Sequence, residues 1–249
     1  MMKPKKLYFD IETSFCLAGV YKTGDQYVSE EQLLDHTRII CIGYMWEGDK
    51  KPTVLKWDNK KDDKKLLKTF AKLMDKADVV IGHNMKKFDF QVVLARIAYH
   101  KLPPIADTLV SDTYRMVKNS MKLPSYKLSY LVRYFKIGLK MRTGGFGLWY
   151  DVVVSNDRKQ LEYMAKYCAM DVKITKALYA RILPYVKDPL NLSSYLGKQC
   201  CPSCGGTVHK HGIALVSKLK KVQRFRCISC GKVSQSGINL LTGTKNILR

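Results

Sequence analysis

The stretch KLYFDIETS, residues 6–14, places two carboxylates, Asp10 and Glu12, at the end of an apolar segment. Its β-branched and aromatic residues predict a buried strand over residues 6–13. Side chains two positions apart on a strand point to the same face, so Asp10 and Glu12 share one. Burying either carboxylate without a counter-charge is costly, and Mg²⁺ or Mn²⁺ would supply that charge. The alternative is a strand at the edge of a sheet whose acids face solvent.

The chain has 249 residues, 46% of them hydrophobic, which is enough for one large domain or one domain and a small module. No run of 18 apolar residues occurs, so no membrane-spanning helix is predicted. The basic start MMKPKK is followed by the first strand rather than by a signal-type apolar region. We therefore expect a cytoplasmic protein whose eight cysteines are not held in disulfides.

Basic residues outnumber acidic ones by 44 to 21, which gives a net charge of +23. A surplus of this size favours a polyanionic partner, and nucleic acid over a membrane. The surplus is uneven, because ten Lys or Arg and no Asp or Glu occur from Gly197 onward. This asymmetry predicts an appended module that contacts nucleic acid. A well-solvated basic surface is the alternative.

The hydrophobic pattern predicts strands first and then alternating helices and strands. The expected strands are residues 6–13, 38–46, 52–57 and 78–84, and the expected helices are residues 60–77, 88–101, 112–122, 126–137 and 157–186. The glycine-rich residues 143–149 are expected to form a loop. This order predicts one α/β domain over residues 1–186, with helices covering a central sheet. Residues 187–199 are expected to be a linker, and residues 200–249 a second module.

Two further carboxylates lie in settings that suggest a common site. Asp89 begins a predicted helix, where the helix dipole favours a negative charge. Tyr167 and Asp171 are four residues apart, so they lie on one face of the long helix. The neighbours of Asp171 are largely apolar, which is unusual for a carboxylate. Singly, Asp89 is explained as a residue of the first helical turn and Tyr167 as a half-buried core residue.

Together, FDIET, GHNMKKFD and YCAMD resemble the three exonuclease motifs of the DnaQ-like, or DEDD, 3′–5′ exonucleases. The tyrosine four residues before the last aspartate is similar to the tyrosine-bearing subclass. The spacers DTYRMVKN, YKLSYL and GGFGLWYD resemble the YprB-type enzymes of bacteria and phages. The resemblance covers residues 5–186. It implies a ribonuclease H-like fold, with a mixed sheet flanked by helices. It also implies a protein of the cytoplasm of a bacterium or of a phage-infected host.

The resemblance also implies a catalytic site with two Mg²⁺ or Mn²⁺ ions. Its ligands would be Asp10, Glu12, Asp89 and Asp171. Tyr167 would orient the attacking water, because a phenol with a reference pKa of about 10 is a poor base at neutral pH. The implied reaction releases 5′-mononucleotides from nucleic acid 3′ ends, with DNA favoured over RNA. Replication, proofreading or repair is the implied context, with a polymerase or another replication protein as candidate partner.

His83 and Asn84 precede Asp89 in a GHN turn that, by resemblance, binds the terminal nucleotide of the substrate. A general-base role for His83 is the less favoured alternative. Asp112, followed by Thr113, is expected to cap a helix rather than to support the metal site. Two other functions stay open: a structure-selective endonuclease on the same fold, and a non-catalytic protein that recruits partners through its C-terminal module. The four mutually repelling acids argue against the second.

Two C-x₂-C pairs, separated by 22 residues, predict a structural zinc site near the C-terminus. The predicted ligands are Cys201, Cys204, Cys227 and Cys230. The segment resembles the zinc ribbons of transposases and other DNA-handling proteins. Cys200 or His209 could replace one ligand, and a redox dithiol is a weaker alternative. The other three cysteines, at positions 16, 41 and 168, are expected to be ordinary buried thiols.

Between the cysteine pairs, KLKKVQRFRC interleaves cations with an aromatic residue. Such a pattern suits contacts with phosphates and stacking on bases. A hairpin whose charges only keep it soluble is the alternative. The predicted nucleic-acid contacts are Lys218, Lys220, Lys221, Arg224, Phe225 and Arg226.

Overall fold

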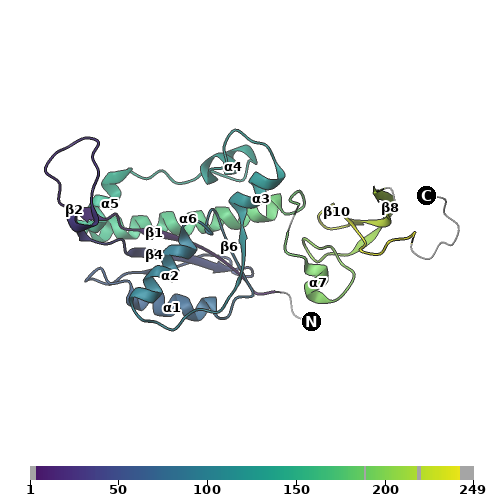
Figure 1. The fold of residues 1–249 in the computed structure, drawn as a ribbon, viewed down its shortest axis with the longest axis horizontal. Helices are drawn as coiled ribbons and strands as arrows, with labels where there is room; N and C mark the ends of the chain where they lie inside the picture. The colour runs from purple at the N-terminus through teal and green to yellow at the C-terminus, as the bar shows by residue number, and fades with distance from the viewer. Residues whose placement is uncertain (1–3, 188, 218–219, 242–249) are drawn as a thin grey trace. The chain divides into compact units, whose positions relative to one another are not determined.

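In the computed structural model, which describes residues 4–187, 189–217 and 220–241, strand β1 (Lys6–Thr13) lies in the middle of a five-stranded sheet (Figure 1). The strand order is β5-β4-β1-β6-β7. Strand β4 (Ile39–Trp46) pairs antiparallel with β1 and with β5 (Thr53–Lys56). Strand β6 (Val79–Gly82) pairs parallel with β1 and with β7 (Leu109–Asp112). The mixed sheet confirms the predicted α/β fold class.

Alternate side chains of β1 contact helices on opposite faces of this sheet. The ring of Phe9 lies 4.9 Å from a phenylalanine ring of α1 (Lys64–Met74), and the ring of Tyr8 lies 5.9 Å from a tyrosine ring of α6 (Arg158–Ile182). Because Asp10 and Glu12 follow Tyr8 at intervals of two, they face α6. The other helices of this part of the chain are α2 (Asp89–Tyr99), α3 (Thr113–Ser120), α4 (Leu128–Tyr134) and α5 (Phe146–Val153) (Figure 1).

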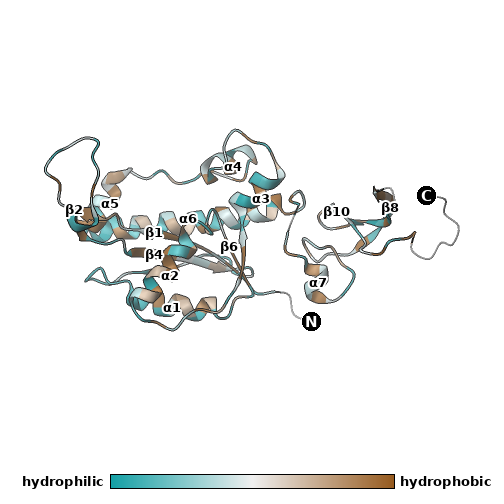
Figure 2. Cartoon of the chain, in the orientation of Figure 1, coloured by the Kyte–Doolittle hydropathy of each residue, from teal (hydrophilic) through white to brown (hydrophobic). Residues whose placement is uncertain are grey.

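The core forms where amphipathic helices meet the sheet. The helical spacing predicts an apolar face of Leu66, Leu67, Phe70, Leu73 and Met74 on helix α1. All of these are buried except Leu73, which is half-buried. Hydrophobic and hydrophilic residues alternate along both α1 and α6 in Figure 2. Helix α5 was not predicted, because the glycines at positions 144, 145 and 147 suggested a loop. It forms because Leu148, Val152 and Val153 pack into the core.

The sequence pattern also failed to predict the short strands of this part of the chain. Strand β7 has only four residues and is defined by its pairing with β6, a contact distant in sequence. A separate two-stranded sheet joins β2 (Leu17–Ala18) to β3 (Leu33–Asp35), which the 3₁₀ helix η1 (Glu30–Gln32) precedes. Pairing of this kind has no local signature in the sequence.

The structure divides into two compact units, which we describe separately. The N-terminal unit contains residues 4–115 and 123–179. The C-terminal unit contains residues 116–122 and the described residues from 180 onward. The proposed division into a domain over residues 1–186, a linker and a module over residues 200–249 stays a prediction.

The C-terminal unit contains a three-stranded antiparallel sheet of order β10-β9-β8. Its strands are β8 (Val208–Ser217), β9 (Lys220–Cys227) and β10 (Val233–Gln235). Within the predicted linker, helix α7 (Leu192–Leu196) forms because its two terminal leucines are buried. The N–H of Leu192 donates to the carbonyl of Pro202 at 2.8 Å, which fixes α7 to the first cysteine pair.

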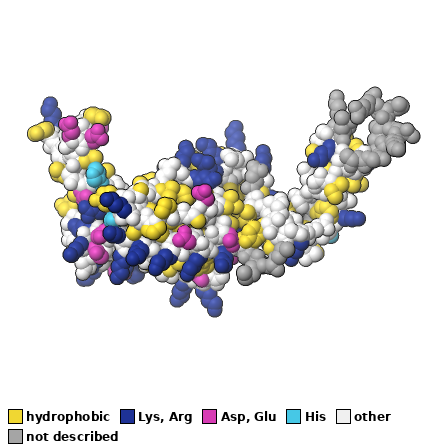
Figure 3. All heavy atoms as spheres, turned by 60° about the horizontal axis from the view of Figure 1, so that its bottom comes forward, with side chains coloured by type: hydrophobic (Ala, Val, Ile, Leu, Met, Phe, Trp, Pro, Cys, Tyr) yellow, Lys and Arg dark blue, Asp and Glu magenta, His cyan; other side chains and the backbone are white. Residues whose placement is uncertain are grey.

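On the face of the molecule that Figure 3 draws, charged side chains are spread out rather than gathered in one place. Figure 3 shows Lys and Arg side chains spread across the visible face, with Asp and Glu between them. The helices of the described residues all fall short of the length and apolar character needed to cross a membrane.

Candidate active site

Asp10 and Glu12 lie on β1 beneath α6. Their carboxylate oxygens and the Sγ of Cys168 all lie within 4.8 Å of one another. On the neighbouring strand, Gly43 is paired with Asp10, and a Cβ at Gly43 would stand 2.9 Å from Cys168 Sγ and 3.2 Å from its carbonyl oxygen. The absence of a side chain at Gly43 therefore lets α6 approach the sheet where Asp10 lies.

Cys168 connects α6 to both strands. Its Sγ accepts a hydrogen bond from the N–H of Gly43 at 3.1 Å and donates to the carbonyl of Asp10 at 3.4 Å. A hydrogen bond with Cys41, together with burial, raises the pKa of the Cys168 thiol well above its ordinary value. The thiol stays protonated, which suits packing rather than metal binding. Cys41 and Cys168 are buried as expected, whereas Cys16 is exposed because it lies just beyond the end of β1.

Asp89 reaches β1 from the first residue of α2. Strand β6 pairs with β1 only at residues 6–8, which leaves the later backbone groups of β1 on that side available. The N–H of Ile11 donates to Asp89 Oδ1 at 3.2 Å. Because Ile11 lies between Asp10 and Glu12, this bond brings a third carboxylate to the first two.

The turn that presents Asp89 is held by Asp112. Asn84 adopts a φ of +64°, in the left-handed region that asparagine tolerates better than most residues. The backbone N–H groups of Asn84 and Lys86 donate to the Asp112 carboxylate at 2.8 and 3.2 Å. Asp112 also accepts from the N–H of Tyr114, at 3.0 Å, in the first turn of α3. It therefore caps α3, as expected, and also shapes the turn.

Asp171 and Tyr167 meet a residue that the sequence did not single out. Lys140 Nζ lies 2.6 Å from Asp171 Oδ2 and 4.8 Å from the centre of the Tyr167 ring. The Tyr167 hydroxyl is hydrogen-bonded to both Asp171 and Lys140. Burial alone would lower the pKa of Lys140, but the Asp171 carboxylate raises it above its ordinary value. Lys140 therefore stays charged and neutralises part of the acidic cluster.

Burial and mutual repulsion raise the pKa values of the carboxylates. Burial, followed by repulsion from Asp89, Glu12 and Asp171, raises the pKa of Asp10 well above its ordinary range. Burial and the nearby Asp171 raise the pKa of Glu12 to about 8 despite Lys140. Burial raises the pKa of Asp89 to about 6. The interactions show that the four predicted acids lie close enough to repel one another.

This donor set fits divalent cations. Asp171 Oδ1 is buried and has no hydrogen-bond partner among the described residues. Leaving such an oxygen unpaired costs about 1–3 kcal/mol or more. Carboxylate oxygens are hard ligands of the kind that Mg²⁺ and Mn²⁺ take, and a cation would also relieve the repulsion. The assignment of Asp10, Glu12, Asp89 and Asp171 as the ligands stays a proposal.

A cavity of about 380 Å³ opens beside the carboxylates and is lined by Asp10 and Asp171. Lys127 and Lys140 place two positive charges on its wall. Lys127 was not singled out from the sequence, because nothing local distinguishes one lysine among many. The cavity is also lined by His83 and Asn84, the predicted substrate-binding residues of this unit. Its other polar lining residues include Tyr114 and Ser129.

Both ring nitrogens of His83 are bonded within the protein. Nδ1 lies 2.9 Å from the hydroxyl of Thr113, and Nε2 lies 3.0 Å from the carbonyl of Tyr126. Burial lowers the pKa of His83 to about 4, so the ring is neutral at physiological pH. We assign the proton to Nε2, which then donates to the carbonyl of Tyr126. The Thr113 hydroxyl lies between Nδ1 and the carbonyl of Gly82, to which it donates at 3.0 Å. This arrangement favours a structural role over general-base catalysis.

The four cysteines of the C-terminal unit form a single cluster. The sulfur atoms of Cys201, Cys204, Cys227 and Cys230 all lie within 4.8 Å of one another. Two of the separations, from Cys201 to Cys230 and from Cys204 to Cys227, are 3.6 and 3.5 Å. A disulfide needs about 2.05 Å, whereas tetrahedral Zn–S bonds of about 2.3 Å place sulfurs about 3.8 Å apart. The donor set therefore fits zinc.

The two alternative zinc ligands, Cys200 and His209, lie outside this cluster. Cys200 is buried but is not among the clustered sulfurs, and the side chain of His209 faces His211 across 6.4 Å. Burial raises the pKa of Cys227, but hydrogen bonds involving Cys230 and Cys204 outweigh it and lower the pKa to about 7. A thiol of this kind readily supplies the thiolate that zinc needs.

The predicted basic contacts lie on and beside β9. Lys221 and Arg226 are exposed, and Arg226 Nη2 lies 2.9 Å from His211 Nε2. Arg224 is also exposed, whereas Lys220 and Phe225 are half-buried. Lys218 lies outside the described residues. The nucleic-acid role of the set stays a prediction.

A third group, formed by Asp62, Asp63 and His100, is explained by packing. Asp63 is fully buried, and Arg96 donates to its two oxygens at 2.7 and 2.8 Å. The N–H of Ile39 donates to the same carboxylate at 2.9 Å. This buried ion pair joins α2 and the start of α1 to β4, and its charge is already balanced.

A five-stranded mixed sheet with an acidic cluster on its central strand is the architecture of a ribonuclease H-like nuclease. A family model described as the RNase_H superfamily matches residues 7–183, and the chain belongs to this superfamily. Among solved structures, the fold is similar to the family B DNA polymerase from the hyperthermophilic archaeon Pyrobaculum calidifontis, with a TM-score of 0.56 and 16% sequence identity. The match covers 74% of this chain and 25% of the polymerase chain. No match was found among curated proteins.

Proposed function

We propose that the protein is a metal-dependent 3′–5′ exonuclease of the DnaQ-like type, in the tyrosine-bearing subclass and similar to the YprB-type enzymes. Asp10, Glu12, Asp89 and Asp171 would hold two Mg²⁺ or Mn²⁺ ions. The products would be 5′-mononucleotides, with DNA favoured over RNA as the substrate. The observation that carries the proposal is the convergence of four acids, two buried and two half-buried, in which Asp171 keeps an unpaired buried oxygen.

Bound metal ions would supply the Lewis acidity that activates a water and stabilises the leaving 3′ oxygen of the substrate. Tyr167 stays protonated because burial raises its pKa, so it can donate a hydrogen bond but cannot act as a base. Its hydroxyl, which is hydrogen-bonded to Asp171, would orient the attacking water. Lys140 and Lys127 line the same cavity, where they would attract the phosphates of the substrate.

Several features support an end-directed reaction on nucleic acid. The cavity is small, at about 380 Å³, which suits one nucleotide rather than a duplex. Similarity to a DNA polymerase fold is consistent with a role in replication, proofreading or repair. In such a role a polymerase would be a candidate partner. The cysteine cluster would hold one zinc ion, and the C-terminal unit would bind nucleic acid.

The test uses purified protein, Mg²⁺ or Mn²⁺, and DNA and RNA oligonucleotides labelled at the 5′ end. A ladder that shortens one nucleotide at a time from the 3′ end is expected, and Asp10→Asn should abolish it. A matched substrate blocked at its 3′ end should resist cleavage. Cutting of the blocked substrate would instead indicate an endonuclease, and no cleavage of any substrate would refute the nuclease.

A further inference from the structure

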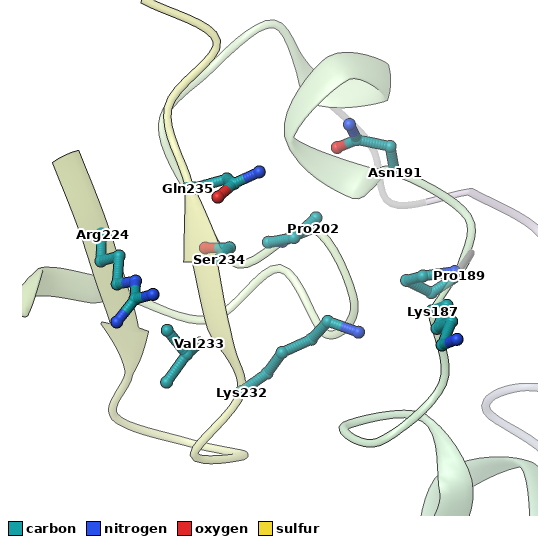
Figure 4. Close-up of a pocket in the computed structure, with 9 residues that line it drawn as sticks. All are labelled: Lys187, Pro189, Asn191, Pro202, Arg224, Lys232, Val233, Ser234 and Gln235. Atoms are coloured by element: carbon teal, nitrogen blue, oxygen red, sulfur yellow. The ribbon is translucent and has the colours of Figure 1, made fainter. Parts of the chain in front are cut away.

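A second cavity lies in the C-terminal unit, beside the cysteine cluster. Its volume is about 680 Å³ (Figure 4). Three cationic side chains line it, from three separate segments: Lys187 before α7, Arg224 on β9 and Lys232 after the second cysteine pair. In Figure 4 the side chain of Lys232 extends toward the segment that carries Lys187.

The rest of the lining suits a phosphate ester. No carboxylate lines the cavity among the described residues, and Asp188 lies outside them. Neutral side chains that can donate hydrogen bonds come from Asn191, Ser234 and Gln235. The apolar contributions come from two prolines and a valine, which can cover a sugar ring but cannot stack on a base as an aromatic residue would.

The cysteine cluster fixes the shape of this cavity. Pro202 lies inside the first cysteine pair, and Lys232 and Val233 follow the second. The N–H of Leu192 donates to the carbonyl of Pro202, and Lys232 Nζ donates to the carbonyl of Val186 at 2.6 Å. Zinc binding at the cluster would therefore position two walls of the cavity.

We propose that this cavity binds the sugar–phosphate backbone of a nucleic acid strand, without reading its sequence. The cations supply the attraction, the neutral donors bond phosphate oxygens, and the absence of an aromatic ring from the described lining directs binding to the backbone. A volume of about 680 Å³ exceeds the need of a single phosphate, which favours a strand over a free anion. The inference deepens the proposed function by locating a second contact with its substrate.

The test measures binding of the full, zinc-loaded chain to a fluorescent oligothymidylate of about twenty nucleotides. Mg²⁺ and Mn²⁺ are omitted, so binding is recorded whether or not the protein cleaves. The variant pair Lys187→Gln/Arg224→Gln removes two cavity cations. The control pair Lys198→Gln/Lys210→Gln removes two exposed cations of the same unit that do not line the cavity.

Each lost phosphate contact lowers the salt slope of single-strand binding by about 0.7, so two contacts lower it by about 1.4. At about 0.1 M salt this corresponds to about 25-fold weaker binding for the cavity pair. The control pair should bind nearly as wild type does. Equal losses for the two pairs, or no loss for the cavity pair with an unchanged zinc content, would overturn the proposal.

Two further arms separate the alternatives. Cys227→Ser should release zinc and weaken binding as much as the cavity pair does; retained binding after zinc loss would contradict the role of the cluster. Thymidine 5′-monophosphate should fail to displace the oligonucleotide, and displacement at low concentration would identify a nucleotide pocket instead. If wild type cleaves nothing but the binding difference persists, the proposed function fails and this inference stands.

Discussion

Replacing Lys140 by methionine should destabilise the protein when Mg²⁺ and Mn²⁺ are absent. Lys140 Nζ lies 2.6 Å from Asp171 Oδ2, so its ammonium forms an ion pair with the acidic cluster. Methionine keeps an unbranched apolar stem of similar length but removes the charge. Asp171 would then be a buried carboxylate that has lost the positive charge of the Lys140 ammonium.

The magnitude follows from the exposure of the pair. Removing one partner of a fully buried ion pair costs about 3–5 kcal/mol. The Lys140 side chain is 26% exposed and that of Asp171 is 4% exposed, so water screens part of the interaction. We expect a loss of about 2 kcal/mol, which lowers the melting temperature by about 4–8 °C for a unit of this size.

The assay is urea and thermal unfolding of four proteins: wild type, Lys140→Met, Asp171→Asn and the double variant. Chelators are avoided, because they would remove zinc from the C-terminal unit. In the Asp171→Asn background, Lys140→Met should cost much less, since the charge that it balances is gone. Added Mn²⁺ should also reduce the cost, because the metal replaces the ammonium as counter-charge.

Two results would refute this reasoning. The first is a Lys140→Met variant whose urea midpoint of unfolding equals that of wild type in the absence of Mn²⁺. The second is a loss in the free energy of unfolding, caused by Lys140→Met, that is the same in the wild-type and in the Asp171→Asn background. Either result would mean that the acidic cluster does not need the Lys140 charge.

Three other predictions concern the same site. Tyr167→Phe should slow cleavage by roughly tenfold to a hundredfold with unchanged Mn²⁺ uptake, since it removes only the positioning hydroxyl; a wild-type rate in single-turnover assays would show the hydroxyl to be idle. Burial raises the pKa of Glu12 from 4.5 to about 8, so the folded protein retains a proton that the unfolded chain loses. The free energy of unfolding without Mg²⁺ or Mn²⁺ should therefore fall as pH rises from about 4.5 to about 8, and Mn²⁺ should reduce the fall; urea unfolding across this range checks both. Gly43→Ala places a Cβ 2.9 Å from Cys168 Sγ and should cost about 1–3 kcal/mol and reduce activity, whereas the control Gly48→Ala, with nothing within 4 Å, should do neither.

The sequence was informative wherever a local pattern carried the structure. The apolar run ending in Asp10 and Glu12 predicted β1 with its observed bounds, and helical spacing predicted the buried face of α1. The positions of Asp89 at a helix start and of Asp171 beside Tyr167 on one helix were likewise predicted. Each of these signals lies within one element.

What the sequence could not supply were contacts between distant elements. Lys140 lies in an irregular segment between α4 and α5, and it is one of 44 basic residues. Its role depends on a contact with a residue 31 positions later, which no local pattern records. The importance of Gly43 likewise appears only once α6 lies against β4. The same holds for the C-terminal cavity, whose cations come from three segments.

The most direct test of the central claim is the number of Mn²⁺ ions bound per chain, measured by electron paramagnetic resonance on the zinc-loaded protein. We predict two ions for wild type, and loss of binding in Asp10→Asn/Asp171→Asn with zinc content unchanged. Wild-type protein that binds no Mn²⁺, or a double variant that binds as much as wild type, would contradict the assignment of this acidic cluster as a metal site.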